Sequence, residues 1–122
     1  KDGRWTISAI KTVRMNLRAA ESFLEVYRGV VSNVQDYDNE LSSSACVAME
    51  ILPAKGATVS SAVSEFRKLA GPFKWDFASR LRPKTLRAKY GISDVQNGIH
   101  CTDLESDGVG ECKAAFGIGA GA

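Results

Sequence analysis

The alternation of apolar and polar residues near the start of the chain is typical of a β-strand. From Trp5 to Met15, one set of alternate positions is mostly apolar and the other is mostly polar, with Lys11 and Ile10 as the exceptions. Because successive side chains of a strand point to opposite faces, this pattern predicts a strand with one face toward a core. The apolar set is Ile7, Ala9, Val13 and Met15, and the polar set is Thr6, Ser8, Thr12 and Arg14.

The segment after the predicted strand has the residue spacing of a helix. Apolar residues recur every three or four positions from Leu17 to Tyr27, which predicts a helix with Asn16 as its N-cap. Further helices are expected over residues 36–41, 59–69 and 103–116.

Two more strands complete the predicted order of elements. Ala45–Leu52 is densely apolar and is expected to be a buried strand, and Val95–His100 is expected to be a short one. The segment Phe73–Gly91 is expected to be mostly irregular, with one short helix at most. This order predicts an α/β (α+β) domain over residues 1–116, with an antiparallel or mixed sheet and helices on its faces, followed by a mobile Gly/Ala tail over residues 117–122.

Composition narrows the class of protein. The 122 residues suffice for one domain with a core, and no apolar run approaches the roughly 20 residues that span a bilayer. The net charge of +2 does not indicate a nucleic-acid-binding protein. The three cysteines form no Cys-x-x-Cys pair, so we expect neither a disulfide framework nor a protein-bound metal, and a reducing, cytoplasmic compartment fits best.

The only histidine of the chain, His100, lies between an amide at Asn97 and polar residues at Thr102 and Asp103. Imidazole is largely neutral near pH 7, and a partner on one ring nitrogen fixes which nitrogen carries the lone pair. Glu111, eleven residues further on, is a candidate partner. His100 is therefore a candidate nucleophile, the alternative being a buried histidine satisfied by its neighbours.

Cations gather just upstream of His100. Between Lys74 and Lys89 there are six cations and a single acid, Asp76. Arginine pairs its donors with phosphate oxygens, so a basic segment beside a nucleophile suggests phosphoryl transfer. The alternative is a solvated or partner-facing surface, which we expect for Arg80, Arg82, Lys84 and Lys89.

The segment from Arg82 to Asp103 resembles the nucleoside diphosphate kinase family. It contains Arg-Pro-Lys-Thr-Leu-Arg and Asn-Gly-Ile-His-Cys-Thr-Asp. The family typically shows Pro-Gly-Thr-Ile-Arg and then Arg-Asn-x-x-His-Gly-Ser-Asp, so Cys101 takes the place of a glycine and Thr102 that of a serine. The wording His-Cys-Thr-Asp-Leu, with Glu-Val-Tyr-Arg-Gly-Val-Val and Cys-Val-Ala-Met-Glu upstream, is similar to the second kinase-like domain of a two-domain ciliary branch.

The resemblance implies a ferredoxin-like β-α-β sandwich with a mostly antiparallel sheet. It also implies one more strand and a helix before Trp5, so the domain is expected to be N-terminally incomplete. That strand carries a phosphate-binding lysine in the family.

The resemblance also implies roles for single residues. His100 would accept phosphate from a nucleoside triphosphate and pass it to a nucleoside diphosphate, with Mg²⁺ bound mainly through the nucleotide phosphates. Glu111 would orient the imidazole, and Asp103 would be structural. Nucleotide contacts would come from Arg67 and Arg87 to phosphate, from Asn97 to ribose, and from Thr102 as a residue that shapes the site.

Three positions depart from the family pattern. Leu24 falls where the family has an active-site tyrosine, Ser32 where an aromatic residue sandwiches the base, and Phe73 where a threonine contacts phosphate. The expected nucleophile is present, while the expected nucleotide clamp is altered.

Two functions follow from these observations. The first is a structural component of ciliary doublet microtubules, located in the cytoplasm, cytoskeleton and axoneme, with tubulin and other axonemal proteins as partners. On this reading, the basic segment faces tubulin's acidic surface and Phe73 or Trp75 anchors the contact. The alternative is an active nucleoside diphosphate kinase. Neither nucleic acid nor membrane is an expected partner.

Overall fold

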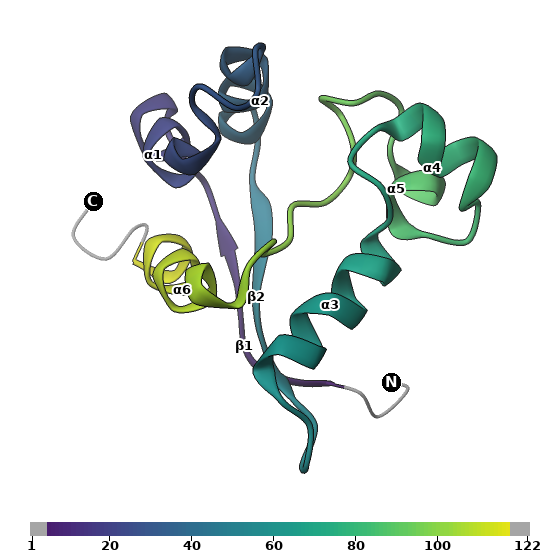
Figure 1. Cartoon of the computed structure of the whole chain (residues 1–122). Coiled ribbons are helices and arrows are strands. Elements are labelled where there is room, and N and C mark those ends of the chain that lie inside the picture. The colour runs from purple at the N-terminus through teal and green to yellow at the C-terminus, as the bar shows by residue number, and fades with distance from the viewer. Residues whose placement is uncertain (1–4, 118–122) are drawn as a thin grey trace. The chain divides into compact units, whose positions relative to one another are not determined.

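The computed structural model describes residues 5–117 (Figure 1). The chain divides into two compact units, each built from two separate segments. Of the described residues, the first unit holds 5–6 and 52–108, and the second holds 7–51 and 109–117. No helix within residues 5–117 has the length and apolarity needed to cross a bilayer.

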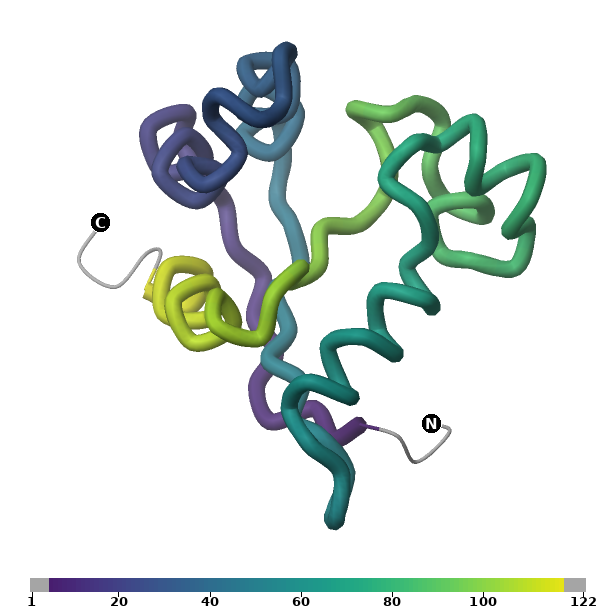
Figure 2. The backbone as a smooth tube through the Cα atoms, in the orientation of Figure 1, coloured from purple at the N-terminus to yellow at the C-terminus, as the bar shows by residue number. Residues whose placement is uncertain are grey.

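Two antiparallel strands form the sheet of the described region. They are β1 (Trp5–Val13) and β2 (Cys46–Pro53), which run side by side in Figure 2. The Ser8 hydroxyl donates to the Glu50 carbonyl oxygen at 3.3 Å and to its carboxylate at 2.7 Å, which marks the register of the pair.

The prediction that β2 is buried was wrong for alternate residues. Val47 is 61% exposed and Met49 is 44% exposed, while Cys46 and Ala48 are half-buried. Ile7 and Ile10 of β1 are also exposed. A sheet of two strands offers few neighbours to cover both of its faces, so part of its apolar surface stays in contact with solvent.

Two helices follow β1 in the second unit. They are α1 (Leu17–Phe23), extended by a 3₁₀ turn η1 (Glu25–Tyr27), and α2 (Val34–Ser42). The predicted cap is confirmed, because the Asn16 side chain accepts a hydrogen bond from the Ala19 amide at 2.8 Å. This bond satisfies one of the amide groups left open at a helix start.

A buried ion pair ties α2 to the end of η1. Asp38 is 1% exposed, and its two carboxylate oxygens accept from the Arg28 guanidinium at 2.9 and 3.1 Å. The Asp38 carboxylate raises the pKa of Arg28 above its ordinary value. Such a two-pronged bond fixes the direction of both side chains.

The last helix, α6 (Gly108–Phe116), is preceded by a 3₁₀ turn, η2 (Glu105–Asp107). The helix therefore begins later than the predicted Asp103. Lys11 of β1 donates to the Phe116 carbonyl oxygen at 3.4 Å, so the end of α6 lies beside β1 in the second unit.

Three helices build the first unit: α3 (Val59–Ala70), α4 (Trp75–Leu81) and α5 (Leu86–Tyr90). The start of β1 packs on α3, because the Trp5 ring meets Phe66 edge to face at 5.4 Å and its indole donates to the Ala62 carbonyl oxygen at 3.2 Å. Gly71 ends α3 with a positive φ of 100°.

Two predictions for the first unit were wrong. The basic segment is not mostly irregular, because α4 and α5 occupy most of it. Val95–His100 is not a strand but a loop, in which Gly98 has a φ of 85° and the Asn97 side chain bonds to neighbouring backbone. A left-handed glycine and a local side-chain bond both favour a turn over an extended ladder.

Candidate functional site

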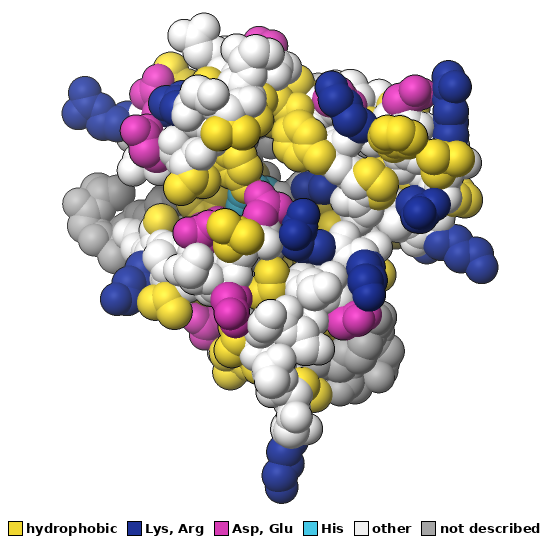
Figure 3. Space-filling model, viewed as in Figure 1, with side chains coloured by type: hydrophobic (Ala, Val, Ile, Leu, Met, Phe, Trp, Pro, Cys, Tyr) yellow, Lys and Arg dark blue, Asp and Glu magenta, His cyan; other side chains and the backbone are white. Residues whose placement is uncertain are grey.

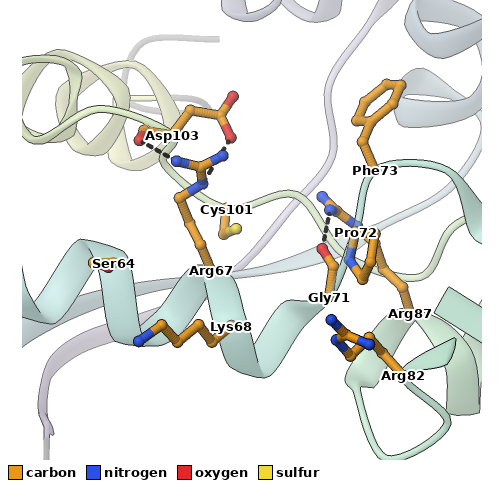
Figure 4. Close-up of a pocket in the computed structure, with 10 residues that line it drawn as sticks. All are labelled: Ser64, Arg67, Lys68, Gly71, Pro72, Phe73, Arg82, Arg87, Cys101 and Asp103. Carbon is orange, nitrogen blue, oxygen red and sulfur yellow. Dashed lines mark hydrogen bonds and ion pairs between the residues drawn. The ribbon is translucent and has the colours of Figure 1, made fainter. Parts of the chain in front are cut away.

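A pocket of about 560 Å³ lies within the first unit (Figure 4). Its wall comes from the C-terminal half of α3, the turn that follows, the start of α5 and the loop after His100. The lining residues are Ser64, Arg67, Lys68, Gly71, Pro72, Phe73, Arg82, Arg87, Cys101 and Asp103. Four of them are cations and one is an acid, so the pocket favours an anion.

Arg67 reaches across the pocket from α3 to the loop after His100. Its Nε lies 3.7 Å from the Asp103 carboxylate, and its guanidinium donates to the Asp103 carbonyl oxygen at 3.4 Å (Figure 4). The Arg67 side chain is 54% exposed, so it remains open to a ligand from solvent. Asp103, which was expected to be structural, thus contacts Arg67 of α3.

Arg87 is held more tightly. It is 7% exposed, and its guanidinium donates to the Gly71 carbonyl oxygen at 2.8 Å and to the Ile99 carbonyl oxygen at 3.3 Å. The guanidinium carbon also lies 5.8 Å from the centre of the Phe73 ring, within the range of a cation–π contact. Arg87 therefore contacts two backbone segments of the pocket wall.

Lys68 and Arg82 line the pocket as well, and sequence reasoning did not assign them to it. Lys68 pairs with Glu65 on the surface of α3 at 3.3 Å. Arg82 ends α4, and its carbonyl oxygen accepts from the Thr85 hydroxyl at 2.7 Å. One feature of the sequence could have indicated that Arg82 lies at the pocket: it precedes the capping residue Thr85 by three positions. The Thr85 hydroxyl bonds to the Arg82 carbonyl oxygen and lies close to Gly71, so it holds the Arg82 backbone near the turn after α3.

His100 lies half-buried in the loop that enters the pocket wall, and Cys101, the next residue, lines the pocket. Asn97 is half-buried in the same loop, where its amide donates to the Asp94 carbonyl oxygen at 3.1 Å and its oxygen accepts from the Ile99 amide at 3.2 Å. Thr102 is half-buried and follows directly. Three predicted site residues, Asn97, His100 and Thr102, thus lie in one loop of the first unit, and this loop contributes Cys101 to the pocket lining.

The other predicted partner lies elsewhere. Glu111 is in the first turn of α6, in the second unit. Leu24 and Ser32 are also in the second unit. The role of Glu111 toward His100 therefore stays a prediction.

The chemistry open to the pocket is the binding of a phosphate-rich anion. Arginine and lysine donors suit phosphate oxygens. Within residues 5–117, no group of three or more His, Cys, Asp or Glu side chains is arranged to hold a metal ion.

Comparison with known proteins shows the family to which the chain belongs. The sequence profile described as "NDK: Nucleoside diphosphate kinase" matches residues 1–118. The chain belongs to the nucleoside diphosphate kinase family.

Individual relatives sharpen the comparison. The chain is 43% identical over 118 residues to "Nucleoside diphosphate kinase homolog 7" of Rattus norvegicus and 42% identical to the protein of that name from Mus musculus. Each match covers 97% of this chain and 28% of the relative, so the chain spans less than a third of the length of these proteins.

Among solved structures, the nucleoside diphosphate kinase of Aquifex aeolicus superposes with a TM-score of 0.78 at 25% identity. That match covers 90% of this chain and 73% of the other. The α+β fold expected from the sequence is confirmed.

Proposed function

We propose that this domain serves as a structural component of ciliary doublet microtubules and packs there against tubulin and other axonemal proteins. The proposal draws on the similarity to homolog 7, and the observation that carries it is an apolar stripe along α4. Phe73, Phe77 and Leu81 are 41%, 57% and 56% exposed. Phe77 and Leu81 are four residues apart in α4, which puts them on one side of the helix, and Phe73, in the turn just before α4, is counted here as the third residue of this α4 stripe.

Several cations lie close to this α4 stripe, and Figure 3 shows dark blue Lys and Arg side chains around yellow hydrophobic ones over the region of α4. Lys74 pairs with Asp94 at 3.2 Å and Arg80 pairs with Asp76 at 3.1 Å, and Arg82 and Lys84 add exposed positive charge beyond those pairs. An apolar centre with a basic rim suits an acidic partner that carries its own apolar side chains.

One expected anchor needs correction. Trp75 is half-buried, and its indole nitrogen is fully buried. Its main-chain amide donates to the Asp94 carboxylate at 2.8 Å. The ring therefore serves the local packing of α4, and the α4 stripe offers Phe73 and Phe77 as anchors instead.

The experiment measures incorporation of tagged variants into axonemal doublets. Phe77→Ser with Leu81→Ser, and separately Arg82→Glu with Lys84→Glu, should lower incorporation several-fold, because buried aromatic anchors and complementary charge both contribute to docking. Val26→Ser, a change at another exposed apolar residue, and Lys55→Glu, at another exposed cation, are the matched controls. Undiminished incorporation of both double variants would reject the α4 stripe as the docking surface.

The pocket favours a second function, phosphotransfer through His100. Arg67, Lys68 and Arg82 would bind the phosphates of a nucleoside triphosphate next to the loop that carries His100. Mg²⁺ would be held by those phosphates, because the one carboxylate of the pocket lining, Asp103, is paired with Arg67. Against turnover stands Phe73, which brings a ring without hydrogen-bonding groups to the pocket.

Labelling with radioactive nucleoside triphosphate and Mg²⁺ tests this second function. A working site should yield acid-labile phosphate that a nucleoside diphosphate removes, and His100→Ala should abolish it. The His100→Ala variant should still be incorporated into doublets if the structural function is separate. A chain that stays unlabelled where an active family member is labelled has no phosphotransfer function.

A further inference from the structure

The position of Arg87 between two backbone segments suggests a role other than direct contact with phosphate. At 7% exposure it is the most deeply buried cation of the pocket lining. Two of its nitrogens donate to carbonyl oxygens, at Gly71 and at Ile99. Its Nε is fully buried and has no hydrogen-bond partner within the described residues, so a ligand reaches that nitrogen only if the pocket rearranges.

The Gly71 end of this bridge is closely packed. A Cβ atom at Gly71 would lie 2.5 Å from the Thr85 hydroxyl oxygen, so the turn and the start of α5 are in close contact. Thr85 caps α5 by accepting from the Ala88 amide, and its hydroxyl donates to the Arg82 carbonyl oxygen. Arg87, the second residue of this short helix, is therefore anchored to the end of α3 through its bond to the Gly71 carbonyl oxygen.

The Ile99 end lies one peptide from His100. The Ile99 carbonyl accepts from Arg87 at 3.3 Å, and the Ile99 amide donates to the Asn97 side chain at 3.2 Å. Both polar groups of Ile99 are thus held, one by a side chain of α5 and one by the loop itself. The backbone that leads into His100 has its direction set by these two bonds.

We propose that Arg87 is a positioning residue, which fixes the backbone at His100 by bridging the Gly71 turn to the Ile99 carbonyl. The direct anion contacts then fall to the exposed cations of the same pocket, above all Arg67 and Arg82. The inference bears on the phosphotransfer function proposed above, but the bridge exists without any ligand, so its test does not depend on turnover.

The sole histidine makes the test specific, because the imidazole C–H signal of His100 in an NMR spectrum of the chain has no overlap from other histidines. Arg87→Lys keeps the charge but has one nitrogen, which cannot bridge the two carbonyl oxygens in the same way. We expect it to shift or broaden the His100 signal in the absence of any ligand. Arg82→Lys is the matched control, since Arg82 lines the same pocket and, within residues 5–117, its guanidinium donates only to the adjacent Leu81 carbonyl oxygen. It should leave the signal in place.

Two results would overturn the proposal: an unchanged His100 signal in Arg87→Lys, or an equal change in both variants. If the His100 signal is unchanged in Arg87→Lys and this variant also binds pyrophosphate at least tenfold more weakly, Arg87 is instead a direct phosphate ligand.

A measurement on the unmodified chain covers the case in which Arg87→Lys fails to fold. When pyrophosphate is added, the guanidinium N–H signals of Arg82 should move and those of Arg87 should not. Movement of the Arg87 signals alone would overturn the proposal. A chain that binds no pyrophosphate would count against the phosphotransfer function, and wherever Arg87→Lys folds, the ligand-free comparison of variants decides the role of Arg87.

Discussion

Phe73 is the residue at which the pocket departs most clearly from the family pattern. The resemblance puts a phosphate-contacting threonine there, and the structure shows an aromatic ring 5.8 Å from the Arg87 guanidinium carbon. The ring supplies a cation–π contact, worth about 0.5–1 kcal/mol at an exposed site, in place of a hydroxyl donor. Phe73 therefore stabilises the pocket wall through its contact with Arg87 and offers no side-chain hydrogen bond to phosphate.

Replacing this ring should improve anion binding. In Phe73→Thr, a hydroxyl replaces the ring, and a hydrogen bond to a charged phosphate contributes about 1.5–3 kcal/mol, so affinity for a nucleoside diphosphate should rise roughly tenfold or more. Isothermal titration calorimetry measures the affinity. Phe73→Val removes the ring without adding the hydroxyl and should give no such gain. Equal affinities for the Thr and Val variants would contradict the prediction.

The family resemblance predicted part of the pocket. It implied that Arg67 and Arg87 both contact phosphate, and the structure places both arginines at one cavity. The acceptors of Arg87 could not be predicted, because carbonyl oxygens at residues 71 and 99 become neighbours only when the chain folds. Arg82 was missed because its sequence neighbours are solvated cations.

Helices were predicted correctly where the helical repeat of apolar residues continues over several turns. The helix from Val59 shows this, as does the pair α1 and η1, which together reach Tyr27 as expected. Where α4 and α5 lie, the sequence predicted a mostly irregular segment with one short helix at most, because Pro83 and the surrounding cations resemble a loop, although Thr85 is a good capping residue. Periodicity needs about two turns to be visible, and α5 has five residues.

Two glycines in different elements should respond to alanine with opposite signs. Gly71 has φ 100° and ψ 174°, a conformation nearly restricted to glycine, and its Cβ would clash with Thr85. Gly71→Ala should lower the free energy of unfolding by about 1–3 kcal/mol. Gly110 lies within α6, where a Cβ would have open space, so Gly110→Ala should raise it by about 0.5–1 kcal/mol.

Urea denaturation of the two variants beside the unmodified chain gives both values. The two glycines serve as controls for each other, since each exchange adds one methyl group. A Gly71→Ala variant as stable as the unmodified chain would mean that the turn after α3 adapts more easily than its geometry implies.

The Arg28–Asp38 pair should matter for the cohesion of α1, η1 and α2. Asp38→Asn keeps the size of the side chain but removes the charge that faces the guanidinium, and breaking a buried pair from one side is destabilising. We expect a lower midpoint of urea denaturation. Asp36→Asn, on the exposed side of the same helix, is the control and should leave the midpoint nearly unchanged. Equal midpoints for all three chains would contradict the prediction.

On the scale of the whole molecule, charge is balanced overall but concentrated locally. The net charge is +2, while the pocket lining gathers four cations and one acid. The Arg67 and Lys68 side chains are 54% and 71% exposed, so salt should screen them. Affinity for pyrophosphate should therefore fall several-fold between about 0.05 and about 0.5 M salt. Calorimetry of Arg82→Gln should show a shallower decline, and an equal slope would exclude Arg82 from the binding site.

Phe73 belongs both to the pocket wall and to the α4 stripe, and this double membership has a thermodynamic consequence. A partner that covers the ring would alter its contact with Arg87, and a phosphate ligand that moves Arg87 would alter the ring that the partner meets. Equilibrium linkage then requires each to change the affinity of the other by the same factor. A nucleotide would in that case act as an effector of assembly without being consumed.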